Sequence, residues 1–263
     1  MNVNIVYMLV TLLATSIGAI AGLGGGVIIK PVFDVIGFHD PQTIGAYSAF
    51  AVFTMAIVST YKQIRNRVKI DKKIGLFISL GSLVGGYLGD VCFEYINSNL
   101  GAGISVDRIQ AGLLFIILLL ILIYTLNKDK FPSYKSESAG IIFGVGFFLG
   151  IISIFLGIGG GPLNVATLTI AFSFDLKDTV VYSIITILAA QISKLGKIFL
   201  VNGIENYNLD SLVFVIVSAV LGGYLGAIIN NKLEERKIEK IYIATIIALM
   251  LISIYNTTNL QII

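Results

Sequence analysis

Apolar stretches of about 20 residues recur along the whole chain, and they limit the fold more than any other feature. A helix of that length crosses the hydrocarbon core of a bilayer, which is about 30 Å thick. Of the 263 residues, 56% are hydrophobic and 13% are charged, roughly half the charge of a soluble domain. The sequence therefore predicts an all-α polytopic protein of the cell membrane. Its eight long spans are expected at about 3–23, 42–61, 74–96, 108–127, 139–157, 179–200, 211–230 and 239–256.

Composition and motifs exclude several classes of function. Cys92 is the only cysteine and His39 the only histidine, which removes intrachain disulfides, cysteine zinc clusters and most histidine chemistry. The net charge of +3 is too small to indicate a nucleic-acid partner. The sequence has no GxSxG or HExxH motif, and its glycine clusters lack the context of a P-loop or a Rossmann fingerprint. We expect no enzyme activity, no metal and no cofactor.

The chain divides into two halves that repeat each other. The polar segment KDKFPSYKSES (128–138), expected to be a cytoplasmic linker, separates an N-terminal transmembrane repeat (1–127) from a C-terminal one (139–263). Four features recur in the same order, which indicates internal duplication. They are GLGGG (22–26) and GIGGG (157–161), Asp40 and Asp175, Tyr47-Ser48 and Tyr182-Ser183, and GGYLG at 85–89 and at 222–226.

The distribution of lysine and arginine indicates how often each half crosses the membrane. If only the eight long spans cross, the 18 basic residues divide into 11 and 7. If the short apolar piece after each glycine cluster, about 25–38 and 160–174, also crosses or re-enters, 14 fall on one side. Cytoplasmic loops are enriched in Lys and Arg, so the second count is favoured. Each half then has five membrane segments, the halves are inverted in the bilayer, and both termini lie outside.

Each glycine cluster has two interpretations. Two glycines four residues apart, such as Gly22 and Gly26, let helices pack closely. Four glycines in five positions exceed that need, and each interior glycine costs a helix about 1 kcal/mol relative to alanine. Pro162, directly after the second cluster, suits the first turn of a new helix. We therefore expect a helix break and a short half-helix at each cluster, whereas close packing is the preferred interpretation of GGYLG.

A helix start presents unpaired N–H groups and the positive end of the helix dipole, which suit an anion. Two inverted breaks would bring two such ends together near the bilayer midplane. The sequence therefore predicts a site for a small anion between the two clusters. The candidate residues are Gly24, Gly25, Gly26, Tyr47, Ser48, Gly159, Gly160, Gly161, Asn164, Tyr182, Ser183 and Lys194.

Some of these side chains also have a structural interpretation. The hydroxyl groups of the two Tyr-Ser pairs could donate to an anion, or they could bridge neighbouring helices. Lys194 lies within a span, where a lysine costs at least a few kcal/mol unless it faces a polar cavity or snorkels. Gln191 lies three residues before it and therefore on the same helix face.

Other charged residues are expected to support the fold. Lys30 and Asp34 stand at i and i+4, a spacing that favours an ion pair. Asp40 and Asp175 precede apolar helices and are expected to cap them, although an exposed Asp40 could also take up a proton. Lys197 lies near the outer end of its span and is expected to snorkel to the interface.

Two halves of about four long spans, each with a GxGGG cluster after its first span, resemble the TauE/SafE sulfite exporter family. The similarity covers nearly the whole chain. In that family a short apolar segment with a proline and a Gly-Leu-Pro-like turn follow the cluster, and Pro31 and GFHDP (37–41) match them here. The second half departs, with Pro162 directly after the glycines and FDLK (174–177) at the turn. The resemblance implies transport of sulfite, sulfonates or related sulfur-containing anions, often outward.

Together, the residues and the resemblance predict a secondary transporter that exports a small sulfur-containing anion, such as sulfite or an organosulfonate, across the lipid bilayer. The sequence contains no nucleotide-binding motif, so a proton gradient or the substrate gradient is expected to drive transport. A passive anion channel, an importer of a related anion and a non-transporting membrane scaffold are the alternatives. No oligomeric state is predicted.

Overall fold

The computed structural model describes residues 3–66, 70–99 and 106–259, which form helices and their connections without a strand. The first half contains α1 (Val3–Ala21), α2 (Gly26–Ile36), α3 (Pro41–Arg65), α4 (Lys72–Asn99) and α5 (Val106–Leu126). The second half contains α6 (Ala139–Phe155), α7 (Gly161–Phe172), α8 (Leu176–Lys197), α9 (Leu212–Lys232) and α10 (Glu235–Asn259). Short helical turns lie at η1 (Lys128–Lys130), η2 (Ile198–Asn202) and η3 (Ile204–Asn206).

Seven helices among the described residues are long and apolar enough to cross a membrane, which confirms the polytopic all-α class. The predicted span at 139–157 corresponds to α6, whose 17 residues are at the lower end of the spanning range. The helices after the glycine clusters are much shorter. With 11 residues in α2 and 12 in α7, they measure roughly 17 and 18 Å, about half of a hydrocarbon core.

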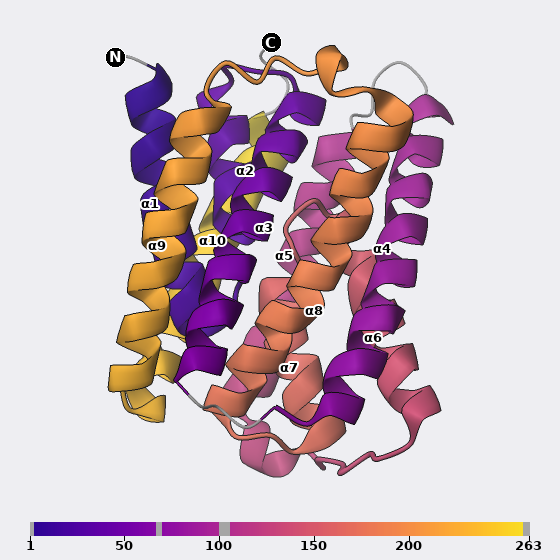
Figure 1. Ribbon diagram of the computed structural model, residues 1–263, viewed down its shortest axis with the longest axis vertical. Coiled ribbons are helices and arrows are strands. Elements are labelled where there is room, and N and C mark those ends of the chain that lie inside the picture. Colours follow the sequence, from indigo (N-terminus) through magenta and orange to yellow (C-terminus); the bar gives the residue numbers. More distant parts are fainter. Residues whose placement is uncertain (1–2, 67–69, 100–105, 260–263) are drawn as a thin grey trace.

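The two short helices turn back toward the face from which the preceding helix came. In Figure 1, α1 enters from the upper face, which carries both termini, and α2 returns to it. Helix α6 enters from the lower face, and α7 returns to that face. The segments after the glycine clusters therefore re-enter rather than cross, and the two hairpins open in opposite directions.

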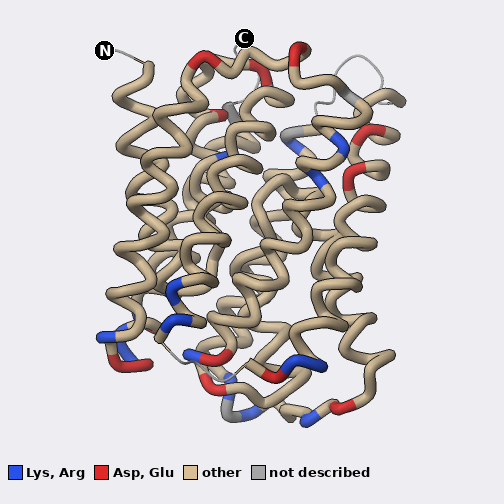
Figure 2. The backbone as a smooth tube through the Cα atoms, viewed as in Figure 1, with Lys and Arg blue, Asp and Glu red and all other residues tan. Residues whose placement is uncertain are grey.

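Lysine and arginine gather at the lower end of the molecule (Figure 2). The α3–α4 connection, the linker, the start of α8 and the α9–α10 turn all lie there (Figure 1). Because cytoplasmic loops are rich in Lys and Arg, we take the lower face as the inner face and the upper face as the outer face.

The helices pack in pairs that cross between the halves. Helix α1 packs on α9 and α6 packs on α4, so the first helix of each half lies against the fourth helix of the other. Helices α3 and α8 contact each other, as do α5 and α10. The GGYLG segments explain the closest of these contacts. A Cβ atom at Gly85 or Gly89 of α4 would overlap the backbone of α6, and one at Gly222 or Gly226 of α9 would overlap that of α1, so the packing interpretation is confirmed.

Replacing Gly85 with alanine is expected to destabilise the protein, because the new methyl group would overlap the carbonyl oxygen of Phe147. Overpacking of this kind costs about 1–3 kcal/mol. Gly144→Ala is the matched control, since no atom lies within 4 Å of a Cβ at this α6 position and alanine should favour the helix. Thermal unfolding in detergent, followed by circular dichroism, compares the two variants. Equal stability would contradict the close α4–α6 contact.

Cysteine labelling tests the sidedness of the membrane segments. In a Cys92→Ser background, Asn66→Cys after α3 and Glu205→Cys in η3 should react with a membrane-impermeant maleimide from opposite sides of intact cells or vesicles. Glu137→Cys in the linker is the control and should label from the same side as Asn66→Cys. Labelling of Asn66→Cys and Glu205→Cys from one side would restore an eight-span topology without re-entrant hairpins.

Candidate functional site: two glycine loops below an outer cavity

The predicted helix breaks are confirmed at both glycine clusters. Helix α1 ends at Ala21 and α2 begins at Gly26, while α6 ends at Phe155 and α7 begins at Gly161. Three glycines in each cluster have positive φ, a conformation that other residues rarely adopt. They are Gly22, Gly24 and Gly25 in the first loop and Gly157, Gly159 and Gly160 in the second, with φ between 67° and 79°. The same three positions thus need glycine for the same backbone reason.

The fourth glycine of each cluster serves a different purpose, because it lets the two loops touch. A Cβ at Gly26 would lie 2.9 Å from the carbonyl oxygen of Ile158, and one at Gly161 would overlap the carbonyl of Leu23. The structure therefore brings the predicted glycines together, at the starts of α2 and α7. It also fills the space between them with backbone, so the nearest open space lies to one side of this contact.

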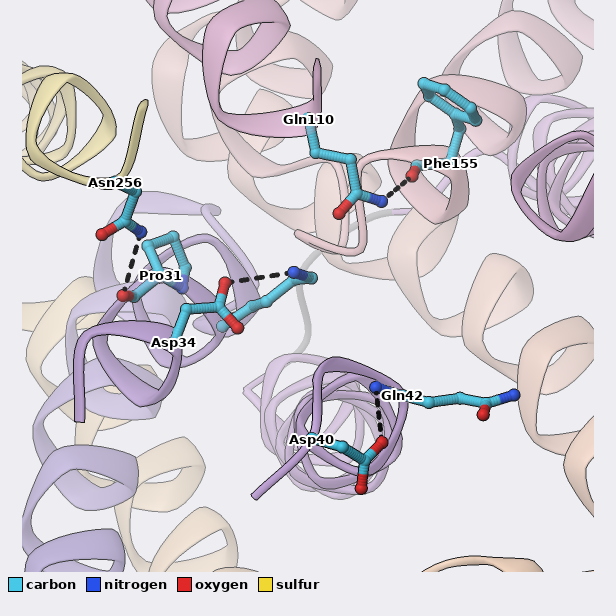
Figure 3. Close-up of polar contacts among 8 residues, drawn as sticks. Pro31, Asp34, Asp40, Gln42, Gln110, Phe155 and Asn256 are labelled. Atoms are coloured by element: carbon cyan, nitrogen blue, oxygen red, sulfur yellow. Dashed lines mark hydrogen bonds and ion pairs between the residues drawn. The ribbon is translucent and has the colours of Figure 1, made fainter. Parts of the chain in front are cut away.

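Side-chain amides satisfy the carbonyl groups exposed where α1 and α6 end. Asn230 of α9 donates to the carbonyl of Ile20, with an N–O distance of 2.6 Å. Gln110 of α5 donates to the carbonyl of Phe155 (Figure 3). In hydrocarbon an unpaired carbonyl costs several kcal/mol, so these two amides make the helix ends tolerable inside the bundle.

The duplicated tyrosines bridge helices. The Tyr47 hydroxyl donates to the carbonyl of Asn208 (2.9 Å) and accepts from the N–H of Ser211 (3.0 Å), just before α9. The Tyr182 hydroxyl accepts from the N–H of Asp71 (2.7 Å), just before α4. Each tyrosine therefore ties its helix to the start of the fourth helix of the other half.

The neighbouring serines lie closer to the glycine loops. Ser183 is fully buried, and its hydroxyl donates to the carbonyl of Gly22 (2.6 Å). The Ser48 hydroxyl lies 3.0 Å from the position that a Cβ on Gly26 would take. Ser48 and Ser183 thus line the glycine contact from α3 and α8, whereas the two tyrosine hydroxyls are used elsewhere.

A cavity opens on the outer side of the glycine contact. It contains about 480 Å³ of space unoccupied by protein atoms, including its open mouth, and Gly157 of the second loop forms part of its wall. Two lysines from opposite halves line it, Lys30 of α2 and Lys194 of α8. Gln42 and Gln110 add neutral polar groups. The lysine predicted for the anion site therefore faces a polar cavity, which explains why it is tolerated within a span.

The cavity arises from small differences between the halves. At Gly22, the nearest atoms to a Cβ position belong to Val180 and Val165, which close this side of the first loop. At an offset of 135, the first half has Gly45 in place of Val180 and Lys30 in place of Val165. The aliphatic part of Lys30 packs against Gly157, and the Lys194 ammonium lies 3.5 Å from a Cβ position on Gly45. A missing side chain and an added lysine thus accompany a cavity on one side only.

Charged pairs surround this cavity. Lys30 forms the predicted ion pair with Asp34, at 3.1 Å and almost fully buried, so this expectation is confirmed. Lys197 does not snorkel freely as expected. Its ammonium pairs with Asp90 at 3.2 Å and with Glu94, both on α4 and four residues apart on one helix face. Asp90 and Glu94 also line the cavity, so this cluster joins the outer ends of α4 and α8 at its rim.

The two duplicated aspartates differ in their contacts. The Asp40 carboxylate accepts from the N–H groups of Gln42 and Thr43, which confirms it as the cap of α3. Burial opposes its ionisation, but these hydrogen bonds outweigh burial and hold the pKa of Asp40 below its usual value. Asp40 is therefore ionised at neutral pH. Asp175 occupies the matching position before α8, but its side chain makes no capping hydrogen bond.

Two further cavities open at the inner end of the molecule. One lies among Tyr124, Lys128, Thr169, Asp175, Glu239 and Tyr242, together with neighbouring apolar residues, and the other includes Asp71, Lys73, Lys135 and Glu137. Among the described residues, neither lining includes a glycine of the two clusters. Of these three cavities, only the outer one is lined by a glycine of the two clusters.

Sequence reasoning missed several polar residues near the glycine loops. Gln110 and Ser153 lie in strongly apolar segments, and Gln110 binds a carbonyl that is 45 residues away in the chain. Lys30 was interpreted only through its local partner. The available signal was a polar residue buried within an apolar run, which costs free energy unless a partner or a ligand compensates.

Comparison with known proteins identifies the family. The family model described as Sulfite exporter TauE/SafE matches residues 7–253. The chain is 27% identical over 259 residues to Probable membrane transporter protein YunE of Bacillus subtilis, covering 89% of this chain and 91% of the relative. It is 25% identical over 246 residues to Probable membrane transporter protein MJ0441 of Methanocaldococcus jannaschii, covering 89% and 88%. No solved structure matches the chain.

Two half-helices meet inside a bundle of spanning helices, beside a cavity with two lysines. Broken helices that meet in this way are typical of membrane transporters. The chain belongs to the TauE/SafE family and is a multi-pass membrane transporter. The family resemblance seen in the sequence is confirmed.

Replacing Lys197 with methionine is expected to destabilise the protein by about 3 kcal/mol, because Asp90 would remain buried without its cation. The double variant Lys197→Met/Asp90→Asn should recover part of this loss. Lys128→Met is the control: Lys128 is 49% exposed in its pair with Glu239, so its loss should cost less than about 1 kcal/mol. Thermal unfolding in detergent measures all three, and equal effects of Lys197→Met and Lys128→Met would contradict a buried rim cluster.

Proposed function

We propose that this chain is a secondary transporter that exports a small sulfur-containing oxoanion, such as sulfite or an organosulfonate. The observation that carries the proposal is the outer cavity, where Lys30 and Lys194 face one space that ends at the second glycine loop. Charge-assisted hydrogen bonds from lysine are strong and suit oxygen-bearing anions. The printed family description, Sulfite exporter TauE/SafE, supports the substrate class.

In this proposal the predicted site is moved to the outer side of the glycine contact. The anion binds between the Lys30 and Lys194 ammonium groups, with Gln42 and Gln110 as neutral polar groups of the same cavity wall. The positive ends of α2 and α7 lie below this position and favour an anion further. Ser48 and Ser183 belong to the glycine contact beneath it.

Transport requires that the glycine contact is reached alternately from the two faces. In this proposal the structure is the outward-facing state and the cavity is the release side of an exporter, while loading from the inside requires the contact to open downward. The two halves, interpreted as inverted repeats, supply equivalent hairpins for both states. The Lys197–Asp90–Glu94 cluster at the rim ties α8 to α4 and must move relative to the cavity when it closes.

The driving force is proposed to be a proton gradient or the substrate gradient itself. Asp40 is a capping carboxylate with a lowered pKa, so it is a poor candidate for the proton carrier. A passive channel is the second candidate function. It would need a continuous path, whereas the backbone contact at Gly26 and Gly161 closes the path in this state.

Sulfite flux in proteoliposomes, measured with and without an imposed pH gradient, tests the proposal. Lys194→Gln is expected to raise the KM for sulfite roughly tenfold or more, because a charged hydrogen bond of about 1.5–3 kcal/mol is lost. Lys237→Gln is the control, because this exposed lysine on α10 lies outside the described cavities. The sulfite flux of this variant should equal that of the unmodified chain.

The flux experiment also separates the alternatives. Carrier behaviour requires saturation and counterflow, whereas conductance without counterflow would favour a channel. The absence of flux for sulfite, sulfate, thiosulfate and methanesulfonate would overturn the substrate class. An unchanged KM in Lys194→Gln would remove this lysine from the site.

A further inference from the structure

We propose that Ser153, Asn164 and Gln191 form a second, deeper oxoanion site at the start of α7, which holds the substrate before it reaches the lysine cavity. The inference rests on the proposed function, because it assigns a further binding step to the same anion. It is carried by a different observation, a group of buried polar side chains without partners.

The three side chains are almost completely buried, with exposed fractions of 1% for Ser153, 0% for Asn164 and 3% for Gln191. The Ser153 hydroxyl, both polar atoms of the Asn164 amide and the amide oxygen of Gln191 have no hydrogen-bond partner among the described residues. A buried polar group left unsatisfied costs about 1–3 kcal/mol. Four such atoms in one place indicate that something absent from the protein alone completes them.

These side chains come from three helices and converge on the second glycine loop. A Cβ on Gly160 would overlap the Ser153 hydroxyl and would lie 2.8 Å from the Asn164 amide oxygen. The Gln191 amide nitrogen lies 3.6 Å from a Cβ position on Gly159. Glycine at these positions therefore leaves the polar groups of α6, α7 and α8 facing bare backbone.

Of the unpartnered atoms, the Ser153 hydroxyl and the Asn164 amide nitrogen can donate to an anion, whereas the two amide oxygens can only accept. The remaining surroundings favour an anion over a cation. Gly160 is the N-cap of α7 and supplies no side-chain cap, so the positive end of this 12-residue helix faces the polar group. The Lys30 side chain packs against Gly157 in the same loop. The described side chains nearest to Gly157, Gly159 and Gly160 include no carboxylate, which a cation site would be expected to have.

The site exists in one half only. At the offset of 135 that relates the glycine loops, Gly18, Ile29 and Ala56 stand in place of Ser153, Asn164 and Gln191. In the first half this location is filled, because Gly18 allows the backbone of Gly25 to pack against α1. Both glycine loops have the same backbone, but these three positions carry unpartnered polar side chains in the second half only.

The position is adjacent to the outer cavity. Ile154 and Gly157, which line that cavity, flank Ser153 and the glycine loop in sequence. An anion loaded from the inner side would thus meet these neutral groups first and would then pass outward to Lys30 and Lys194. Neutral donors bind an anion less strongly than lysines do, which lets the anion leave again when the loops separate.

Isothermal titration of the full-length chain in detergent with sodium sulfite, sulfate, nitrate and methanesulfonate tests the deeper site. Ser153→Ala and Asn164→Leu should each weaken oxoanion binding about tenfold, and Asn164→Asp should weaken it more, because its charge repels the ligand. Thr11→Val is the matched control, since it removes a buried, unpartnered hydroxyl from α1. Thermal unfolding without anion checks that each variant folds.

The outcomes separate this inference from the proposed function. Sulfite transport that depends on Lys194 but is unchanged in Asn164→Leu and Ser153→Ala would overturn the deeper site and leave the function standing. Oxoanion binding that requires Asn164, with no preference for sulfur oxoanions, would support the site and overturn the substrate class. Tighter binding of sodium in Asn164→Asp, with anion affinity unchanged, would show a cation site and overturn the inference.

Discussion

The structure depends on one backbone contact, made where the two glycine loops meet inside the bundle. In hydrocarbon, irregular backbone is tolerated only where protein or a water-filled cavity covers it. Gly26 and Gly161 allow each loop to press against a carbonyl of the other, at Ile158 and at Leu23. Each half therefore helps to bury the break of the other.

The helix packing follows from the same constraint. Because the first helix of each half must hold its loop at the centre, it packs on the fourth helix of the other half, and glycines on α4 and α9 permit the close approach. The hydroxyls of Tyr47 and Tyr182 then tie α3 and α8 to the starts of those same helices. Side chains that could have bound an anion are therefore used to join the halves.

The features that were predictable from the sequence are local or periodic. Glycine costs and lysine topology predict the helix breaks, and the i,i+4 spacing of Lys30 and Asp34 predicts their ion pair. Contacts between distant segments leave no such pattern. The partner of Lys197 lies on another helix, more than a hundred residues away in the chain.

The sequence could predict the chemistry of the candidate site, but not its position. Repeated glycines suggest a symmetric site between the loops, because a repeat pattern carries only what the halves share. The position of the cavity depends on what they do not share, such as Gly45 in place of Val180. Its effect appears only when Gly157 of the other half is brought next to it. Packing between the halves, and not periodicity within one, decides where open space remains.

A transporter built from two equivalent hairpins must still distinguish its two faces, and the side chains provide that distinction. The backbone of the two loops is nearly the same, with positive φ at matching glycines. Lys30 stands where the other half has Val165, and Asn164 stands where it has Ile29. Both exchanges place a polar side chain at the second loop where the other half has an apolar one. In the proposed mechanism, the shared backbone lets the contact open toward either face, while the unshared side chains give the anion a binding position around one loop only.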